Sequence, residues 1–572
     1  MTKSLKRIIS VVLCAVMLFS CSTAASAIDI DKEGITSSAF TMVADILTKG
    51  LNAVVDGVLN VVSSLIPASV KVKDPSEYTS DNFMPGNEEF IDAPAEGAAW
   101  SLGYSSASII PDDFSKGIYC KGGYTVNKKL TDCLDDLRVR VIALNDGSGR
   151  GTAVFAIVDG LGLANSDVRR IRAAVADYAR ENNIVSINVS ATHVHSGIDT
   201  QGIYTDTFNN VFKNLGMSIL GSENLAEPVN PKFLQHLINQ TAHCIKEAEA
   251  NMTQGKLLYA HTDINEYVRD RTAPDISLDE LYRLEFLPDN GSKPTMIANF
   301  GVHPEAIGFK HDVATADFVY YTEKVVNAAG YNFIYIQGAV GTITERMDLS
   351  NDGLSLDRIE ATKRYGEEIG YILLSMTESM EYCISITDPA REALAAESEG
   401  YTPWYENHVT VRETEVEPIL NIKHAEYMVP VENGVYKALG KVALANNAMY
   451  IDKRTNEMTT STEVGYMELG SDIKVILCPG ETYAELIKGG ENMEGFAYDT
   501  AYDIMGTEDV LVFDLMNDAA GYIMPDDYFT YLTVTYGADG LSIGHSWGLT
   551  SLGKHAASNI YGEIYKLYES VK

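Results

Sequence analysis

The chain has 572 residues and a formal net charge of −35. This length exceeds what a small core needs, so we expect one large enzyme-sized domain with elaborations, or two domains. So large an excess of negative charge repels phosphate backbones and anionic membranes. It therefore argues against nucleic-acid binding and against electrostatic docking on such membranes.

Residues 1–27 have the pattern of a bacterial secretory signal peptide. Basic residues precede an apolar run from Ile8 to Phe19, and the small residues 25–27 offer a cleavage site. The apolar run is short for a membrane span. We therefore predict a secreted or cell-surface protein that is cleaved after Ala27. Lipoprotein anchoring at Cys21 is the less favoured alternative.

Five cysteines follow the predicted signal peptide, and they are scattered along the chain without a paired C-x-x-C spacing. This pattern favours neither a disulfide scaffold nor a thiolate zinc site. A single bridge between Cys120 and Cys133 stays open as an alternative.

Residues 28–97 are predicted to form a leader that precedes a catalytic domain at 98–572. Apolar residues recur at helical spacing over 38–66, which predicts an amphipathic helix followed by a polar linker. The main interpretation is that the apolar stripe of this helix packs on the catalytic domain. A lid or an interfacial helix with peripheral membrane contact is the alternative.

Apolar strands and helices alternate from about residue 98. Residues 152–163, 166–183 and 184–195 read as strand, helix and strand, with Ser166 as the helix cap. This order implies a parallel pair with a crossover, and hence a layered α/β fold. The order recurs in the strand at 294–303 and the helix and strand that follow it. Ligands of such sheets gather at the carboxyl ends of the strands.

Histidines stand at these predicted strand ends. In an extended strand, His193 and His195 would point to the same face, and neutral imidazole suits zinc. Taken alone, the pair is equally compatible with a structural role. His303 ends another predicted strand. Glu481 follows a Pro-Gly turn, where a carboxylate either caps a helix or joins histidines as a metal ligand.

The segment "SATHVHSG" resembles the T-H-x-H-S-G signature of the neutral ceramidase family. These are secreted zinc-dependent amidases that cut the amide bond between a fatty acid and a sphingoid base. Further family motifs follow in the same order at Val302-His303, at the loop Gln337–Gly341, at Pro479-Gly480-Glu481 and in "NDAAGYIMPDDY". The resemblance spans residues 98–545 and implies the α/β, mixed-sheet layered catalytic domain of that family. The family's C-terminal β-sandwich domain is not expected here.

The resemblance also implies a set of site residues. The zinc ligands fall on His193, His303, Glu481 and Tyr522. The active-site residues fall on His195, Arg271, Thr344 and Tyr536, with Arg269 as the alternative to Arg271. Thr344 stands where the family has a serine, because the loop reads Gly-Thr-Ile-Thr-Glu instead of Gly-Asp-x-Ser-Pro.

The predicted function is that of a secreted zinc-dependent hydrolase. It would cleave an amide bond in a ceramide-like N-acyl lipid by metal-activated water. The changed glycine loop leaves two alternatives open. One is a catalytically altered binding protein with the same fold, and the other is a hydrolase of a different N-acyl or ester substrate. The expected partner is a lipid or small-molecule substrate, and no protein partner is inferred.

Overall fold

The computed structural model describes most of the chain. The described ranges are 37–272, 275–308, 310–346, 357–395, 410–490, 493, 495–537, 540–545 and 547–572. Within them, the side chains of 37–43, 45, 46 and 534–546 are not described. The predicted signal peptide and the alternative anchor at Cys21 lie outside the described residues, so both stay predictions.

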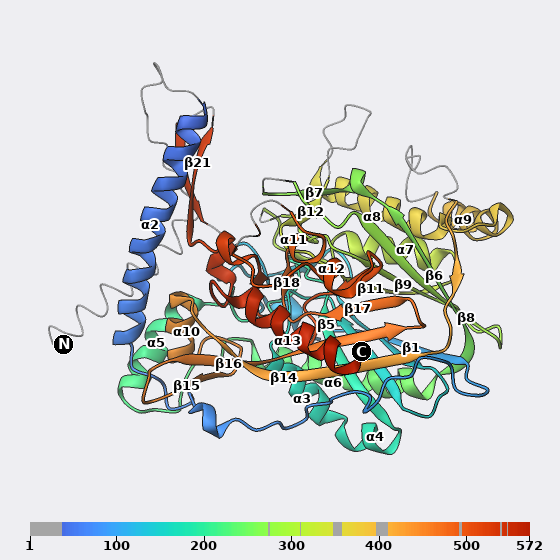
Figure 1. The fold of residues 1–572 in the computed structure, drawn as a ribbon, viewed down its shortest axis with the longest axis horizontal. Helices are drawn as coiled ribbons and strands as arrows, with labels where there is room; N and C mark the ends of the chain where they lie inside the picture. Colours follow the sequence, from blue (N-terminus) through green and yellow to red (C-terminus); the bar gives the residue numbers. More distant parts are fainter. Residues whose placement is uncertain are drawn as a thin grey trace.

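A large mixed sheet forms the first half of the fold (Figure 1). Its strands run in the spatial order β11 (Asn332–Gln337), β9 (Thr295–Phe300), β8 (Glu280–Pro288), β6 (Thr253–Asp263), β1 (Trp100–Ser108), β3 (Arg138–Asn145), β4 (Thr152–Val158) and β5 (Ile184–Ala191), with β13 (Thr414–Glu415) paired to β6. The pairs β4/β5 and β11/β9 are parallel, and the other pairs are antiparallel.

A smaller sheet forms from later residues. Its strands are β14 (Leu420–Pro430), β16 (Met458–Leu469), β17 (Ile473–Leu477) and β19 (Val510–Phe513), with β15 (Met449–Ile451) paired to β16. The pair β17/β19 is parallel. Short two-stranded pairings complete the strands: β2 (Asp132–Cys133) with β10 (Val313–Ala314), β7 (Val268–Asp270) with β12 (Ile343–Glu345), β18 (Glu481–Thr482) with β20 (Tyr522–Ile523), and β21 (Leu532–Gly537) with β22 (Gly540–His545).

The two sheets pack face to face between two layers of helices. Alternate residues of each strand face opposite sides, so one strand serves two cores. On β4, Phe155 packs between the sheets, whereas Val154 faces helices. On β17, Val475 packs between the sheets, whereas Ile476 faces helices on the other side. The order of layers is therefore helix, large sheet, small sheet, helix.

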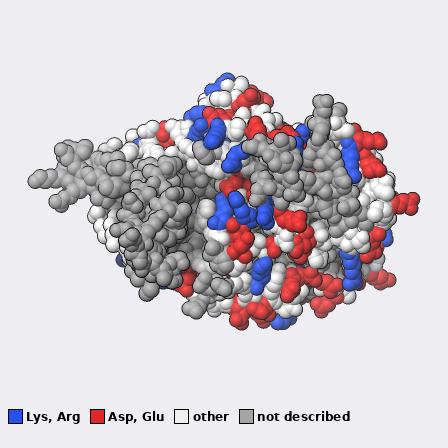
Figure 2. All heavy atoms as spheres, turned by 90° about the horizontal axis from the view of Figure 1, so that it is seen from above, with Lys and Arg blue, Asp and Glu red and all other residues white. Residues whose placement is uncertain are grey.

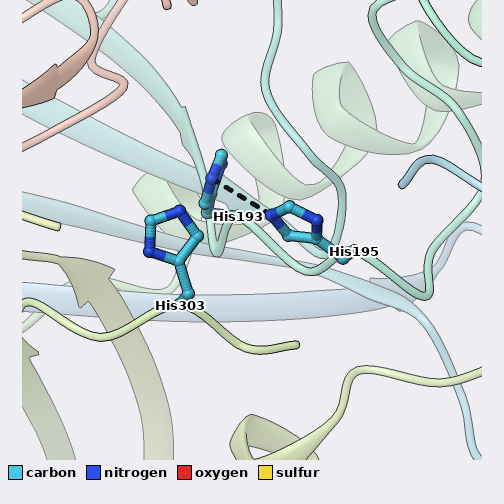
Figure 3. Close-up of side chains that lie close together, drawn as sticks. All are labelled: His193, His195 and His303. Atoms are coloured by element: carbon cyan, nitrogen blue, oxygen red, sulfur yellow. Dashed lines mark hydrogen bonds between the residues drawn. The ribbon is translucent and has the colours of Figure 1, made fainter. Parts of the chain in front are cut away.

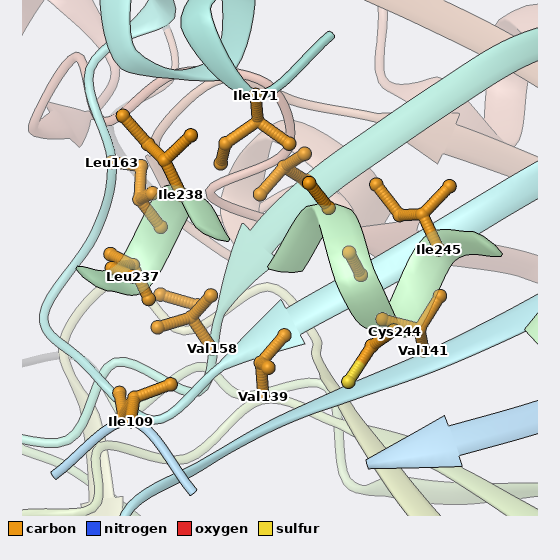
Figure 4. Packing of buried hydrophobic residues seen from close by; sticks show 14 of the residues in the cluster. Ile109, Val139, Val141, Val158, Leu163, Ile171, Leu237, Ile238, Cys244 and Ile245 are labelled. Carbon is orange, nitrogen blue, oxygen red and sulfur yellow. The ribbon is translucent and has the colours of Figure 1, made fainter. Parts of the chain in front are cut away.

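The helices are divided among the outer faces of the sheets. The large sheet is covered by α3 (Asn165–Ala174), α4 (Ala176–Glu181) and α6 (Pro231–Ala250) at one end, and by α7 (Phe318–Ala328), α8 (Arg358–Ser375) and α9 (Met380–Leu394) at the other. The small sheet is covered by α11 (Glu485–Lys488), α12 (Ala501–Met505) and α13 (Ala556–Val571). Figure 4 shows α6 laid on the large sheet, where its Leu237 and Ile245 belong to the same core as Val141 of β3 and Val158 of β4.

The layered α/β architecture predicted from the sequence is confirmed, and so are its crossovers. The helices α3 and α4 connect the parallel strands β4 and β5, and α7 connects the parallel strands β9 and β11. The helix expected at 166–183 is divided at Val175. Ser166 does not cap it, because the helix begins one residue earlier and Asp518 accepts a hydrogen bond from the Asn165 amide.

The segment with the predicted amphipathic helix forms α2 (Ser37–Leu65), which lies against α10 (Gly434–Lys441) and β21 (Figure 1). One face of α2 is buried, including Val55 and Leu59. The opposite face exposes a row of apolar residues, with Val54 and Val61 more than 60% exposed. Contact of this row with a lipid surface stays a prediction.

All five cysteines in the described ranges are free thiols, so the bridge considered between Cys120 and Cys133 is absent. The two residues pair with different parts of the chain. Cys120 forms a β-bridge with Lys129 and accepts a hydrogen bond from its ammonium group. Cys133 lies on β2, beside β10.

The described surface carries charges of both signs. Figure 2 shows acidic and basic side chains interspersed over the described part of one face. None of the described helices is both long enough and apolar enough to span a bilayer.

Candidate metal centre

The histidine segments lie at the edge where strands of the large sheet end. His193 and His195 are in the loop after β5, and His303 is in the loop after β9. The sequence predicted that both strands continue to their histidines, and this is wrong. β5 ends at Ala191 and β9 ends at Phe300. The histidines therefore belong to loops held by rigid strands, which is a common place for functional residues.

The backbone of His193 is left-handed, with a φ of 65°. This conformation costs a non-glycine residue about 1–3 kcal/mol, and it persists only where the surroundings impose it. The strand-alternation argument for His193 and His195 consequently does not apply. The turn itself brings the two rings together, with centroids 5.0 Å apart and planes at 89°.

Three imidazole rings converge at this edge (Figure 3). The ring centroids of His193 and His303 are 4.7 Å apart, and those of His195 and His303 are 5.5 Å apart. One ring nitrogen from each histidine lies within 4.8 Å of the others. His193 and His303 are buried, and His195 is half-buried. These residues form a group that could hold a metal ion.

Backbone carbonyls fix the orientation of two of the rings. The Nδ1 atom of His193 lies 2.7 Å from the carbonyl oxygen of Leu161, and Nδ1 of His303 lies 2.8 Å from that of Ile343. A carbonyl only accepts hydrogen bonds, so each Nδ1 must carry the proton and donate it. This leaves each Nε2 facing the centre, which is the usual arrangement for a metal-binding histidine.

Glu481 faces the same centre from the segment that follows β17 of the small sheet. It lies on β18, paired with Tyr522 of β20, and α11 begins only at Glu485. The helix-capping alternative for Glu481 is therefore wrong. Its Oε2 atom is 3.4 Å from His193 Nε2 and 3.5 Å from His303 Nε2. No hydrogen-bond partner for Oε2 exists among the described residues. Burial alone would raise the pKa of Glu481, whereas positive charge on His193 and His303 would hold it well below its usual range.

These donors fit a cation. Burial and the charge of Arg271 lower the pKa of His303 to about 4, so this ring is neutral at pH 7. Its Nε2 lone pair lies 3.2 Å from the Arg271 Nη2 donor and 3.5 Å from the Glu481 carboxylate, and a metal ion between this lone pair and the carboxylate would satisfy both. Ligands about 2.0–2.1 Å from a tetrahedral ion lie about 3.3–3.4 Å from one another. The observed separations of 3.4 and 3.5 Å match that spacing.

Two donor sets share His193 and His303. In the first, Glu481 and Tyr522 complete the site, and the Tyr522 hydroxyl is 3.4 Å from His303 Nε2. In the second, His195 completes it, with its Nε2 atom 3.4 Å from His193 Nε2. Burial and the negative charge of Glu481 raise the pKa of Tyr522 well above its usual value, so its hydroxyl keeps its proton unless a cation displaces it.

The structure shows which of the two candidate arginines, Arg269 or Arg271, lies at the centre. The Nη2 atom of Arg271 is 3.2 Å from His303 Nε2, and its guanidinium lies over the ring of Trp547, 4.4 Å from the centroid. Its Nη1 atom donates a hydrogen bond of 2.7 Å to Glu305. The side chain of Arg269, two residues earlier on β7, is exposed. Arg271 is therefore the arginine at the centre.

Thr344 also lies beside the centre, because its backbone forms a β-bridge with His303. Its hydroxyl group is buried between two carboxyl groups, 3.1 Å from Glu305 Oε1 and 2.8 Å from Glu345 Oε2. Burial raises the pKa of Glu345 to about 8. Tyr536 lies on β21, but its side chain is outside the described residues. The structure therefore brings Thr344 to the centre and leaves the position of the Tyr536 ring a prediction.

Gln337 is a residue whose role the sequence did not indicate, although its loop was singled out. Its buried side-chain amide donates to the carbonyl oxygens of Thr192 and Val302, at 3.2 and 2.9 Å. Its Oε1 atom accepts from the Val302 amide at 3.3 Å. Thr192 and Val302 immediately precede His193 and His303. One side chain thus holds both histidine loops in register.

Asp514 holds the segment that carries Glu481, as Gln337 holds the histidine loops. No sequence motif indicated Asp514. Its fully buried carboxyl group accepts hydrogen bonds from the Thr482 amide at 2.7 Å and the Thr482 hydroxyl at 2.6 Å. It also accepts from the Val340 amide at 3.1 Å. Burial raises the pKa of Asp514 well above its usual value. Asp514 thereby joins the β18 segment to the glycine loop after β11.

Glu305 was also missed, although it follows His303 and Pro304 directly in the sequence. Burial alone would raise its pKa, but the positive charge of Arg271 lowers it to about 2. Glu305 is therefore ionised and pairs with Arg271. A carboxylate two residues after a strand-end histidine is the signal that would have identified it.

The chain is thus a layered α/β protein with a candidate metal centre at the carboxyl ends of its strands. Neutral ceramidase from Pseudomonas aeruginosa is similar in structure, with a TM-score of 0.53 and 15% sequence identity over 82% of this chain and 73% of that one. A ceramidase complexed with C2 gives a TM-score of 0.51 and 13% identity, over 83% of this chain and 75% of that one. The protein therefore has a neutral ceramidase-like fold, as its ordered motifs predicted.

Comparison of the sequence with protein-family models and with curated proteins finds no match. The likeness is therefore carried by the fold.

Proposed function

We propose that this protein is a secreted zinc-dependent hydrolase that cleaves the amide bond of a ceramide-like N-acyl lipid. One observation carries the proposal: the Nε2 atoms of His193 and His303 and the Oε2 atom of Glu481 converge at 3.4–3.5 Å. They do so within a neutral ceramidase-like fold. Two histidines and a carboxylate are a common ligand set of catalytic zinc.

The proposed ligands are His193, His303, Glu481 and Tyr522, and His195 is assigned to catalysis. Zinc bound there would polarise the substrate carbonyl and lower the pKa of water from about 15.7 toward about 7. We prefer Glu481 to His195 as a ligand because its negative charge offsets that of the cation. Burial and the proximity of His193 lower the pKa of His195 well below its usual value, so its ring is neutral and able to accept a proton.

Arg271 is proposed to stabilise the oxyanion that forms on the substrate carbonyl. Its guanidinium stays charged, and Nη2 lies at the centre next to His303. Glu305 holds the other arm of this guanidinium, and the Thr344 hydroxyl lies 3.1 Å from Glu305. In this scheme Thr344 positions Arg271 through Glu305. Tyr536 is proposed as a further hydrogen-bond donor.

Removal of the metal tests the proposed function directly. Treatment with 1,10-phenanthroline should abolish release of free amine from N-acyl lipids, and added zinc should restore it. The measurement is amine release from a panel of N-acyl amides and matched esters, together with the metal content of the protein. Hydrolysis that continues in the metal-free protein would contradict the zinc-dependent chemistry.

Arg271 and Arg269 offer a matched pair of substitutions. Arg271→Gln should lower kcat/KM about 10²–10³-fold, because one donor to the developing charge is lost. Arg269→Gln should leave kcat/KM unchanged, since this side chain is exposed. Steady-state kinetics of both variants on one amide substrate provides the test. Equal losses in the two variants would remove Arg271 from the mechanism.

One observation favours a second candidate, a secreted binding protein with this fold. The Thr344 hydroxyl, at the family's serine position, is occupied by Glu305 and Glu345. A protein that holds zinc and binds an N-acyl lipid but turns over neither amides nor esters would support this candidate. Turnover of esters alone would support a hydrolase with a different substrate.

A further inference from the structure

An apolar cavity lies between three helices on the α2 side of the fold. Its wall is formed by Leu59, Val62 and Ile66 of the α2 segment, by Val211 of α5 (Thr207–Ile219) and by Leu439 of α10. The described residues that line it include no charged side chain. Such a cavity suits a hydrocarbon chain and disfavours a polar head group.

This cavity adjoins the candidate metal centre. Leu161 anchors His193 through its carbonyl oxygen, and the next residue, Gly162, touches the lining of the cavity. A Cβ atom on Gly162 would lie 2.4 Å from the side-chain nitrogen Nε2 of Gln201 and 2.6 Å from the Cβ atom of Ala519. Both Gln201 and Ala519 line the cavity.

A second segment, which includes Tyr124 and Val126, also connects the candidate metal centre to the cavity. The ring of Tyr124 packs on the ring of His195, with centroids 5.1 Å apart. Two residues later, Val126 lines the cavity. Two short segments therefore connect the lining of the cavity to residues that contact His193 and His195.

The α2 wall is held in place by specific polar contacts. The Asn52 side chain accepts hydrogen bonds from the amides of Tyr531 and Leu532, at 2.6 and 2.9 Å, and donates to the Leu532 carbonyl oxygen at 2.6 Å. One turn later, Asp56 accepts from the Tyr531 hydroxyl at 3.0 Å. Another turn on, Lys437 donates to Asn60 at 3.1 Å. These contacts fix which face of α2 lines the cavity.

We propose that this cavity binds the alkyl chain attached to the scissile bond, and that α2 determines the chain length accepted. The inference rests on the proposed function and assigns to the segment before the catalytic fold a role in substrate choice. The shared chemistry is a saturated hydrocarbon chain, which an N-acyl lipid carries on its acyl side or on its amine side.

Neighbouring valines of α2 provide the test and its control. Val62 is 3% exposed and faces the cavity, whereas Val61 is 61% exposed on the outer face. Val62→Phe fills the cavity and should lower the ratio of kcat/KM for long-chain to short-chain substrates. Each methylene group excluded should lower this ratio about fourfold. Val61→Phe should leave it unchanged.

Two substrate series identify the side of the bond. In one, the acyl chain is lengthened on a fixed amine, and in the other the amine chain is lengthened on a fixed acyl group. Loss of long-chain preference in one series assigns the cavity to that chain. If Val62→Phe lowers turnover of long and short chains equally in both series, the inference is overturned. Should Val62→Phe fail to fold, Val62→Ala enlarges the cavity and should move the preference toward longer chains; an unmoved preference also overturns it.

A binding measurement separates this inference from the proposed function. Dodecanol has no bond to hydrolyse, so its binding can be followed by calorimetry whether or not the protein is an amidase. We expect the wild-type protein and Val61→Phe to bind dodecanol equally, and Val62→Phe or Val62→Ala to change its Kd about tenfold or more. Binding without amide turnover would retain the cavity assignment and reject the proposed reaction. Absence of dodecanol binding to the wild type would reject the cavity assignment.

Discussion

Replacement of His193 or Glu481 by alanine is expected to remove the metal and the activity together. Each variant loses one of two donor atoms, His193 Nε2 and Glu481 Oε2, which lie 3.4 Å apart in the centre. The wild type should contain about one zinc ion per chain, and each variant should fall close to zero. Hydrolysis should fall at least about 10³-fold. Metal analysis of the purified proteins, beside amine release from one N-acyl lipid, measures both effects.

His195→Ala is the control that separates the two donor sets. If Glu481 and Tyr522 complete the site with His193 and His303, His195→Ala should keep the metal and lose most of the activity. Loss of metal in His195→Ala with retention in Glu481→Ala would instead select the three-histidine set. Unchanged zinc in the His193→Ala protein would show that the ion binds elsewhere.

Gln337→Leu is expected to weaken the fold and the centre at once. The leucine has a similar size but leaves the carbonyl oxygens of Thr192 and Val302 without their donor. Each buried group left unpaired costs about 1–3 kcal/mol, so loss of both donors should lower the free energy of unfolding by about 2–6 kcal/mol. Because the histidine loops lose their common support, metal affinity should also fall about 10–100-fold. Denaturant unfolding and zinc titration measure the two quantities.

Gln235→Leu serves as the matched control, since Gln235 is an exposed residue of α6 whose amide donates to Asn239. It should change neither the unfolding free energy nor the zinc affinity. A Gln337→Leu protein that unfolds and binds zinc like the wild type would show that the loops are held by other contacts.

The sequence predicted the place of the centre better than its local geometry. Apolar runs ending near His193 and His303 were sufficient to place both residues at the carboxyl ends of strands, and the structure puts both strands in the large sheet. The positive φ of His193 could not be predicted, because the carbonyl of Leu161 and other tertiary contacts impose it. Glu481 was similarly placed next to its turn, but its pairing with Tyr522 depends on a strand that comes later in the chain.

The supporting residues and the α2 cavity were beyond prediction for the same physical reason. Gln337 and Asp514 act through hydrogen bonds to segments far away in sequence, and no local periodicity records such contacts. The helical pattern over 38–66 predicted a helix with a buried stripe. It could not show that Val62 faces a cavity beside the centre, because the other walls come from α5 and α10.

The donors are divided between two sheets, and this division sets the order in which the centre can assemble. His193 and His303 follow strands of the large sheet, whereas Glu481 and Tyr522 follow strands of the small one. A growing chain therefore completes its histidines long before its carboxylate is synthesised. The proposed donor set is complete only after the two sheets have docked, so metal binding by this set would be a late step in folding. An ion bound there would also join the sheets and oppose their separation.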